Sequence, residues 1–375
     1  MRCCEIVPSL EEKHGGPSKS VLALSEALGS LGPQVSLLST HPNSFAPARS
    51  SSIDVRVFRR DRPQAICPSS GLRRHLDEQP FDIVHHHSLW LRTLHYAQRR
   101  ARSLRAPFVI SPRGMMSPWA WQHHGWRKQL VRHFIHPGAF EAADGWHATS
   151  PEEADEIRSH GFKQPVCVAP NGVAIPTAGD HTAATAHWHT LCQDTIERPT
   201  ALFYSRLHRK KRVLELIDLW LAQAPASWLL LIVGTPEEYT PAQLEAYVLR
   251  NSGGGRVRVF DGAGAPPPYS VASLFILPSH SENFGMVIAE SLAHGLPVLV
   301  TDSTPWTKVN SLGCGWCVPW ETFPTTLRLA LAETSEQRAQ RGAIGLDFVR
   351  RDFPWEKSAA TLLRFYRELQ ERSAA

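Results

Sequence analysis

The chain has 375 residues, which is enough for two α/β domains that each bury a core of their own. A formal net charge of +5 is modest for this length, and no long basic run or nucleic-acid-binding motif occurs, so we expect no nucleic-acid partner. Seven cysteines, an odd number at irregular positions, argue against the disulfide framework of a small secreted protein.

Targeting signals and redox motifs are weak. The N-terminus lacks the apolar core of an export signal, and the longest aliphatic run, residues 228–233, is far too short to cross a bilayer. We therefore expect a cytoplasmic protein, at most peripheral on the inner face of the membrane. Cys314 and Cys317 have the spacing of a redox pair, but they do not open a helix after a first strand, so we interpret them as structural.

The N-terminal stretch predicts a strand, a glycine loop and a helix. An apolar strand over 3–7 is followed by His14 and the pair Gly15-Gly16, and a helix over 18–31 has one apolar face. The order strand, glycine loop, helix is typical of the start of a dinucleotide-binding fold. A lone Gly-Gly pair is a weak signal, however, and a plain tight turn remains the alternative.

Further strands are predicted over 35–39, 55–58, 82–87 and 108–111. The third of these ends in three adjacent histidines. Because side chains alternate along a strand, His85 and His87 share one face and His86 lies on the other, which leaves two potential ligands at most. No cysteine or acidic cluster of metal-ligand spacing lies nearby, and we therefore predict no metal site.

The segment 117–137 is rich in tryptophan, arginine and lysine and is predicted to be helical. Such a composition suits a membrane interface, so one interpretation is a peripheral membrane contact. The alternative, which we favour, is a helix that covers its own domain. Residues 176–198 are mostly Ala, Thr, His and Asp without strong periodicity, and they predict an irregular linker at a domain boundary.

Four cations in six residues follow the next predicted strand, which covers 201–204. They include Arg206 and Lys211, and they precede an amphipathic helix over 213–221. A charge run is usually a solvated surface. Parallel sheets, however, bind ligands beyond the carboxyl ends of their strands, and this run lies directly at such an end. We therefore expect these cations to contact a ligand.

Three more strands are predicted over 228–233, 257–260 and 274–278. After the last of them, Glu282 lies in a loop and Glu290 lies about two turns into a helix. The amides of Asn283, Phe284 and Gly285 lie at the helix start, where unpaired N–H groups suit a phosphate. Two carboxylates beside a phosphate would repel it, unless each carboxylate binds neutral hydroxyl groups of the ligand instead. The pattern therefore indicates a ligand with a sugar, a diphosphate and a ribose.

Glu282 and Glu290, with Asn-Phe-Gly between them, resemble the signature of the family 4 glycosyltransferases, retaining enzymes of the GT-B fold. The resemblance covers nearly the whole chain. It implies an α/β architecture of two Rossmann-like, doubly wound parallel-sheet domains that face across a cleft. The expected parts are an acceptor-binding domain over 1–175, a linker over 176–198, a donor-binding domain over 199–354 and a helix over about 355–375 that packs back on the first domain.

The resemblance also assigns donor-binding residues. Glu282 is expected to contact the donor sugar and Glu290 to hold the nucleotide ribose. The cations that grip the diphosphate are Arg206 and Lys211. The other donor-binding residues that it implies are the phosphate-binding Asn283, Phe284 and Gly285, Gly262 beside the base, and Gly16 at the diphosphate.

The catalytic candidates that the resemblance implies are Glu282, Arg113 and His14. Many relatives have a histidine where this chain has Arg113. An arginine is a fixed cation that cannot act as a base, so it either stabilises charge on the leaving phosphate or positions the acceptor. The resemblance further implies retention without an enzymic nucleophile, by attack on the face from which the diphosphate departs, with the phosphate helping to deprotonate the acceptor.

The expected activity is transfer of a sugar from a UDP-, GDP- or ADP-sugar to a sugar or lipid-linked hydroxyl acceptor. Thr304-Pro305-Trp306 is similar to relatives with bacterial cell-surface roles, which implies exopolysaccharide, lipopolysaccharide or glycolipid synthesis. Fixed cations can stabilise the departing diphosphate, and the chain has no Asp-x-Asp motif, so we expect no metal and no other cofactor. The alternatives are a nucleotide-sugar epimerase and a non-catalytic nucleotide-sugar-binding protein.

Overall fold

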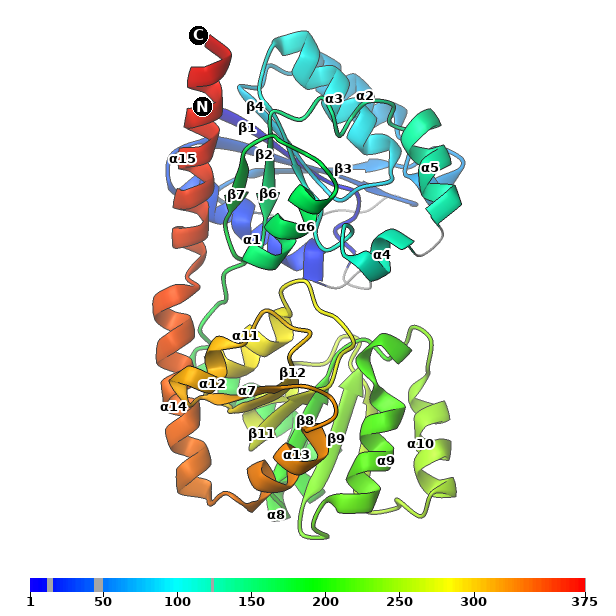
Figure 1. Cartoon of the computed structure of the whole chain (residues 1–375), viewed down its shortest axis with the longest axis vertical. Coiled ribbons are helices and arrows are strands. Elements are labelled where there is room, and N and C mark those ends of the chain that lie inside the picture. The colour runs from blue at the N-terminus through cyan, green and yellow to red at the C-terminus, as the bar shows by residue number, and fades with distance from the viewer. Residues whose placement is uncertain (12–15, 44–49, 123–124, 375) are drawn as a thin grey trace. The chain divides into compact units, whose positions relative to one another are not determined.

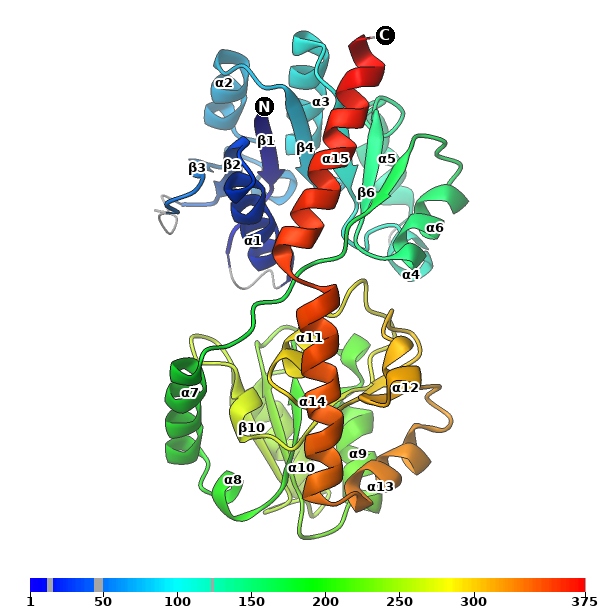
Figure 2. The same cartoon turned by 90° about the vertical axis from the view of Figure 1, so that its left-hand side faces the viewer.

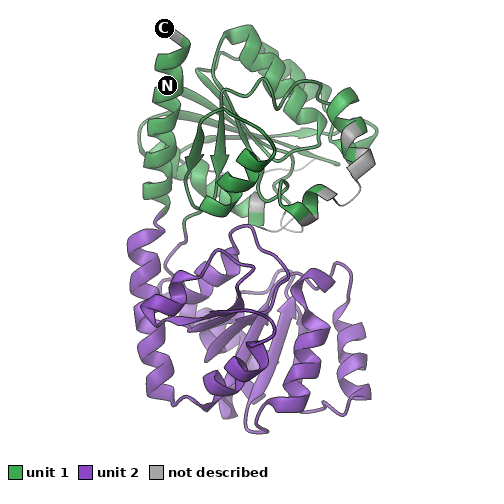
Figure 3. Ribbon diagram, viewed as in Figure 1, with its two compact units in different colours: residues 1–172, 355–375 green, residues 173–354 purple. Residues whose placement is uncertain are grey.

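The computed structural model describes residues 1–11, 16–43, 50–122 and 125–374. The chain forms two compact units (Figure 3). Unit 1 comprises Met1–Gly172 and Trp355–Ala375, and unit 2 comprises Val173–Pro354. The chain therefore leaves unit 1 once and returns to it with its last helix.

The described part of unit 1 forms a seven-stranded parallel sheet in the order β3-β2-β1-β4-β5-β6-β7 (Figure 1). The strands are β1 (Arg2–Val7), β2 (Gln34–His41), β3 (Asp54–Arg59), β4 (Ile83–His87), β5 (Phe108–Ser111), β6 (Gly145–Ala148) and β7 (Val166–Val168). The central strands β4 and β5 are buried along their whole length, because helices cover both faces of the sheet. Apolar runs predict β1 to β5, whereas the three-residue β7 is too short to be predicted.

Two helices far apart in the sequence pack together on one face of this sheet. Helix α1 (Gly16–Ser30) and helix α15 (Trp355–Ala374) lie side by side, and Leu28 and Tyr366 belong to their shared buried cluster (Figure 2). The helices that pack on the other face include α2 (Ser70–Glu78), α3 (Arg92–Leu104) and α6 (Pro151–Ser159). The sheet therefore has a separate apolar core on each face.

The helix predicted over 117–137 is two short helices, α4 (Pro118–Gln122) and α5 (Gly125–Phe134). The residues that join them lie outside the described part of the chain. In α5 the side chains of Leu130 and Phe134 are 49% and 66% exposed. A search of the described helices finds none that is both long and apolar enough to span a membrane.

The described part of unit 2 forms a six-stranded parallel sheet in the order β10-β9-β8-β11-β12-β13. The strands are β8 (Thr200–Tyr204), β9 (Leu229–Gly234), β10 (Val257–Asp261), β11 (Leu274–Leu277), β12 (Val298–Thr301) and β13 (Gly315–Val318). Its helices include α9 (Val213–Gln223), α10 (Pro241–Arg250), α11 (Met286–Ala293), α12 (Lys308–Leu312), α13 (Phe323–Ala332) and α14 (Ser335–Asp352). Cys314 and Cys317 are buried free thiols at β13.

The irregular linker expected over 176–198 is instead helical and belongs to unit 2. It consists of α7 (Ala178–Leu191) and the single turn α8 (Asp194–Glu197). A capping box between Thr177 and Asp180 starts α7. The helix buries little besides Ala184 and Trp188, and so narrow an apolar stripe leaves no clear periodicity in the sequence.

Both sheets reverse their strand order beside their first strand. The reversal lies between β1 and β4 in unit 1 and between β8 and β11 in unit 2. Because the strands are parallel, the loops that follow two such neighbours meet at the carboxyl edge of the sheet, where doubly wound folds bind ligands. The predicted cations after β8 and the predicted carboxylates after β11 are therefore brought together by the topology.

Candidate functional site

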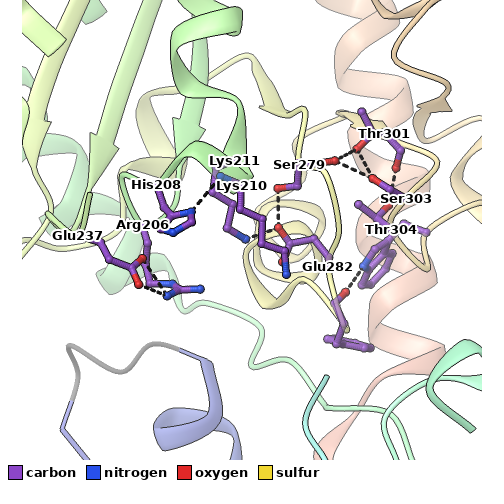
Figure 4. Close-up of polar contacts among 12 residues, drawn as sticks. Arg206, His208, Lys210, Lys211, Glu237, Ser279, Glu282, Thr301, Ser303 and Thr304 are labelled. Carbon is purple, nitrogen blue, oxygen red and sulfur yellow. Dashed lines mark hydrogen bonds and ion pairs between the residues drawn. The ribbon is translucent and has the colours of Figure 1, made fainter. Parts of the chain in front are cut away.

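The centre of the unit 2 site is an ion pair between Lys211 and Glu282 (Figure 4). Lys211 ends a 3-10 turn that follows β8, and Glu282 lies in the loop after β11. Only 8% of the Lys211 side chain and 11% of the Glu282 side chain are exposed. Ser279 adds a hydroxyl donor, with its Oγ 2.6 Å from Glu282 Oε1.

The electrostatic surroundings keep Glu282 ionised. Burial raises the pKa of its carboxyl, but the charge and hydrogen bond of Lys211 and the hydroxyl of Ser279 outweigh this, so the pKa lies below its ordinary value. A buried charge is tolerated when it is paired and hydrogen-bonded. Lys211 and Glu282 can therefore both be buried only because each neutralises the charge of the other.

Hydroxyls at the end of β12 support the loop of Glu282. The carbonyl oxygen of Ser279 accepts from Thr301 Oγ1 at 2.5 Å and from Ser303 Oγ at 2.6 Å. The amide of Glu282 donates to the carbonyl of Ser303 at 3.3 Å. Figure 4 shows these residues gathered around one turn of the loop. The loop that carries Glu282 is therefore fixed by the end of β12, while Lys211 holds the carboxylate itself.

Gly285 connects this loop to α11. Its φ of 77° lies in the left-handed region that favours glycine, and a Cβ there would lie 2.9 Å from Ile288 Cδ1. Trp306 Nε1 donates to the carbonyl of Phe284 at 2.5 Å and fixes the chain just before the helix. The first amides of a helix lack acceptors within it, so α11 presents N–H donors beside the ion pair. Asn283 lies in the same connection.

Glu290 lies in α11, and Tyr269 O–H donates to its Oε2 at 2.7 Å. Tyr269 is buried, and it belongs to a 3-10 turn over Pro268–Val271, between β10 and β11. Burial and the Glu290 carboxylate raise the pKa of this phenol well above its ordinary value. The phenol is thus a permanent donor that orients Glu290.

Arg206 does not join the Lys211–Glu282 pair. Its Nη1 lies 2.7 Å and 2.9 Å from the two carboxylate oxygens of Glu237, on the loop that follows β9 (Figure 4). The side chains of Arg206 and Glu237 are 44% and 40% exposed. Since an exposed ion pair contributes about 0–1 kcal/mol, Arg206 can leave Glu237 at little cost.

Of the four remaining predicted positions, Gly262 and Gly16 lie elsewhere, His14 lies outside the described residues, and Arg113 is described below. Gly262 follows β10 at the edge of the sheet, with its amide 3.1 Å from the carbonyl oxygen of Gly234 in β9. Gly16 is the exposed first residue of α1 in unit 1. His14 lies outside the described part of the chain.

Arg113 follows β5 in unit 1 and is 8% exposed. Its Nη1 donates to Asn171 Oδ1 at 2.8 Å, and its Nε and Nη2 lie 3.3 Å and 3.0 Å from His87 Nδ1. Arg113 and Gly114 both have positive φ, at 55° and 78°, and the amide of Gly114 donates to the buried Glu153 at 2.6 Å. Burial lowers the pKa of Arg113 to about 10, so it remains a cation at neutral pH.

The alternation expected for the three histidines of β4 is confirmed. His85 and His87 lie together, with ring centroids 4.0 Å apart, and both contact the carboxylate of Glu5 in β1. His86 faces the other way and bonds to Ser88 and Thr93. His147 in β6 joins the first pair, with its ring centroid 5.3 Å from that of His85.

Comparison with known proteins decides the family. A model described as Glycosyltransferase Family 4 matches residues 14–175, and a model described as Glycosyl transferases group 1 matches residues 198–333. The chain belongs to the family 4 glycosyltransferases.

A relative agrees with this family, and solved structures agree with the GT-B fold. The D-inositol 3-phosphate glycosyltransferase of Xylanimonas cellulosilytica is 26% identical, over 96% of this chain and 93% of the relative. The structure of sucrose-phosphate synthase from Thermosynechococcus elongatus has a TM-score of 0.76 at 20% identity and covers 99% of both chains. Anabaena HepE in complex with UDP-glucose has a TM-score of 0.71 at 17% identity, over 97% of this chain and 100% of that chain. The two structural likenesses show the fold.

Several residues of this family 4 glycosyltransferase escape prediction from the sequence. They are the charge and hydroxyl partners Glu5, Glu237, Ser279, Tyr269 and Asn171. Glu5 alone has a local signal, because a carboxylate within an apolar strand is rarely buried unless it is paired. The others lie in loops or turns whose role depends on which strand ends become neighbours.

Proposed function

We propose that this glycosyltransferase moves a sugar from a nucleotide-diphosphate sugar to a hydroxyl acceptor with retention of the anomeric configuration. The observation that carries the proposal is the buried Lys211–Glu282 pair at the start of α11. It places a cation, a carboxylate and helix-terminal amides at one carboxyl edge of a doubly wound sheet, which is a combination suited to a sugar diphosphate.

The residues have separate roles in this proposal. Glu282 accepts hydrogen bonds from hydroxyls of the donor sugar, and Glu290, oriented by Tyr269, accepts from the ribose. Lys211 stabilises negative charge on the diphosphate, and Arg206 joins it after leaving the exposed Glu237. Arg113 supplies a further fixed cation for the leaving phosphate or for positioning the acceptor.

The proposed reaction needs no metal ion, because fixed cations stabilise the departing diphosphate. Turnover should therefore persist in EDTA. Loss of turnover in EDTA that Mg²⁺ or Mn²⁺ restores would contradict this part of the proposal.

A donor screen tests the proposal. Thermal-shift measurements with UDP, GDP, ADP and their common sugars should reveal one nucleotide series that stabilises the protein, by about 2.7 kcal/mol at a hundred times its Kd. UDP-glucose is the first choice, because HepE was solved in complex with it. The stabilising donor is then incubated with sugar and lipid-linked acceptors. NMR of the product should show the anomeric configuration of the donor.

Three results would contradict the proposal. A product with the inverted anomeric configuration would exclude a retaining mechanism. Conversion of the donor without any acceptor would indicate an epimerase. Binding of a donor without nucleotide release with any acceptor would indicate a binding protein.

We place the reaction in bacterial cell-surface polysaccharide or glycolipid synthesis, with the segment 117–137 as a peripheral membrane contact. The exposed side chains of Leu130 and Phe134 in α5 support this contact. Co-sedimentation with anionic vesicles should fall when both are changed to Ser. Equal binding of the wild type and this variant would remove the membrane contact from the proposal.

A further inference from the structure

Glu5 is a fully buried carboxylate in the middle of β1, and three side chains donate to it. His87 Nε2 lies 2.7 Å and His85 Nδ1 lies 3.1 Å from Glu5 Oε2, and Tyr366 O–H donates to Oε1 at 2.8 Å. Burial raises the pKa of Glu5, but the neighbouring histidines outweigh this and hold it below its ordinary value. Glu5 is therefore an anion at the centre of unit 1.

This anion determines which nitrogen of each histidine carries a proton. An ionised carboxylate only accepts, so a proton lies on His87 Nε2. His85 Nδ1 also lies 2.6 Å from the phenol oxygen of Tyr366, whose own proton is donated to Glu5, so His85 Nδ1 carries a proton as well. The Nδ1 of His87 is then a lone pair, which matches the two N–H groups of Arg113 directed at it. His147 Nε2 lies 2.9 Å from the carbonyl oxygen of Ala169, so its Nδ1 is likewise a lone pair.

The rings of His87 and His147 are neutral. Burial is the largest cause that lowers the pKa of each ring well below its ordinary value, and the positive charge of Arg113 lowers it further. A protonated His87 would also have no acceptor to offer Arg113. The rings of His87 and His147 therefore present lone pairs beside the guanidinium.

We propose that Glu5 is a positioning residue for Arg113: through the Nε2–H tautomer of His87 it makes that ring an acceptor that holds the guanidinium in place. This inference rests on the proposed function of Arg113. Asn171 Oδ1 accepts a hydrogen bond from Nη1, and His87 Nδ1 accepts hydrogen bonds from Nε and Nη2. A guanidinium has five donor protons, so the described residues leave some of them for a ligand.

A metal ion is the other cation that such a cluster could hold. One ligand atom from each of His85, His87 and His147 lies within 4.8 Å of the other two, and donation of the second ring nitrogen to a carboxylate or carbonyl is typical of metal-binding histidines. Arg113, however, already occupies the lone pair of His87. The charges of the buried carboxylates Glu153 and Glu5 act on Arg113, and a divalent cation together with the guanidinium would still exceed these two negative charges. The structure thus favours Arg113 as the cation of this cluster.

The first test measures the tautomers directly. Long-range ¹⁵N–¹H spectra of the wild-type protein with ¹⁵N-labelled histidine should show His87 as the neutral Nε2–H form and His85 as the Nδ1–H form. His87 in the Nδ1–H form, or as an imidazolium at pH 7.5, would overturn the inference. Elemental analysis showing one metal ion per chain would also overturn it. Neither measurement requires transferase activity, so they stand even if the proposed function fails.

The second test separates positioning from folding. Glu5→Met removes the acceptor and should lower kcat at least tenfold while the donor KM changes less than threefold. Glu5→Gln keeps an oxygen that can accept from His87 and should restore kcat to within about fivefold of the wild type. Tyr366→Phe is the matched control, because it removes a different donor to Glu5, together with the hydrogen-bond partner of His85 Nδ1, and leaves the His87 bond intact. It should reduce stability while kcat changes less than threefold.

Two activity results would contradict the inference. One is a folded Glu5→Met variant with wild-type kcat. The other is a Tyr366→Phe variant that loses as much kcat as Glu5→Met, which would indicate a general structural effect. If Glu5→Met does not fold, Glu5→Gln decides the question. A kcat within about fivefold of the wild type, with His87 still in the Nε2–H form, supports the inference, and a normal kcat with the other tautomer overturns it.

Discussion

The two units each hold a buried cation near the carboxyl edge of a parallel sheet, but they hold it in opposite ways. In unit 1 the acceptors of Arg113 are the neutral groups His87 and Asn171, and the anion Glu5 lies behind His87. In unit 2 the acceptor of Lys211 is the carboxylate of Glu282 itself. Arg113 is oriented by neutral acceptors, although the charges of Glu153 and Glu5 also act on it, whereas Lys211 is paired directly with a carboxylate.

This difference follows from the two side chains. A guanidinium is planar and has five donors, so neutral acceptors on one edge can fix its direction, while an ammonium on a flexible stem needs a charge to hold it. We therefore expect Arg113 to act as a permanent positive charge. Lys211 should transfer part of its bonding from Glu282 to a phosphate when Glu282 engages a sugar.

The largest effect is expected where the charge pair of unit 2 is broken. Lys211→Met leaves Glu282 nearly buried without a counter-ion, which should lower the free energy of unfolding by about 3 kcal/mol. It also removes a cation from the proposed diphosphate site, so kcat should fall at least about 100-fold. Urea unfolding and donor turnover measure the two effects.

The double variant Lys211→Met with Glu282→Gln is the control for this prediction. Removing both charges should recover most of the lost stability while kcat stays low, because a buried pair is costly to break and much less costly to replace. A double variant as unstable as Lys211→Met would contradict the paired-charge account. Wild-type kcat in either variant would remove the proposed roles in catalysis.

Acid should destabilise unit 1 more than unit 2, by less than the effect of breaking the Lys211–Glu282 pair. Burial lowers the pKa of His86 to about 3 and that of His136 to about 4, both in unit 1. The unfolded chain protonates each histidine near pH 6.5, so the stability from a neutral buried histidine is lost as pH falls from that value. At pH 5 each such histidine should cost unit 1 about 2 kcal/mol.

The ion pair of unit 2 responds in a different pH range. Because the pKa of Glu282 is lowered, its contribution is lost only as pH falls below the ordinary range of a carboxyl. Among the described histidines of unit 2, His280 and His294 have a lowered pKa, with that of His294 at about 4. Hydrogen exchange at pH 7.5 and pH 5.0, corrected for intrinsic rates, should show β4 losing more protection than β8. Equal losses would contradict the comparison.

The smallest effect concerns the second carboxylate of unit 2. Tyr269→Phe removes the phenol that orients Glu290. It should raise the donor KM about threefold to tenfold, because only part of the about 1.5–3 kcal/mol of a hydrogen bond to a charged group is expected to be lost from ribose binding. The value of kcat should change little, because the ribose is far from the reacting bond. A fall in kcat with unchanged KM would place Glu290 in the chemical step instead.

Much of the fold and part of the site could be predicted from local patterns. Short apolar runs predict central strands such as β5 and β9, which are buried along their whole length. Glu282 and Glu290 lie eight residues apart, and Arg206 and Lys211 lie five apart, so each pair is visible in a short window. Helix α7 escaped because its few buried positions leave no clear periodicity.

The sequence by itself determined the two-sheet α/β architecture and the residue types at the site, because both depend on neighbours within about ten positions. Only the tertiary structure decided which charges meet: Lys211 with Glu282, Arg206 with Glu237, and Arg113 with His87 instead of a carboxylate. These partners lie on different strand ends, 26 to 71 residues apart in the chain. The order of parallel strands brings them together, and no local pattern encodes that order.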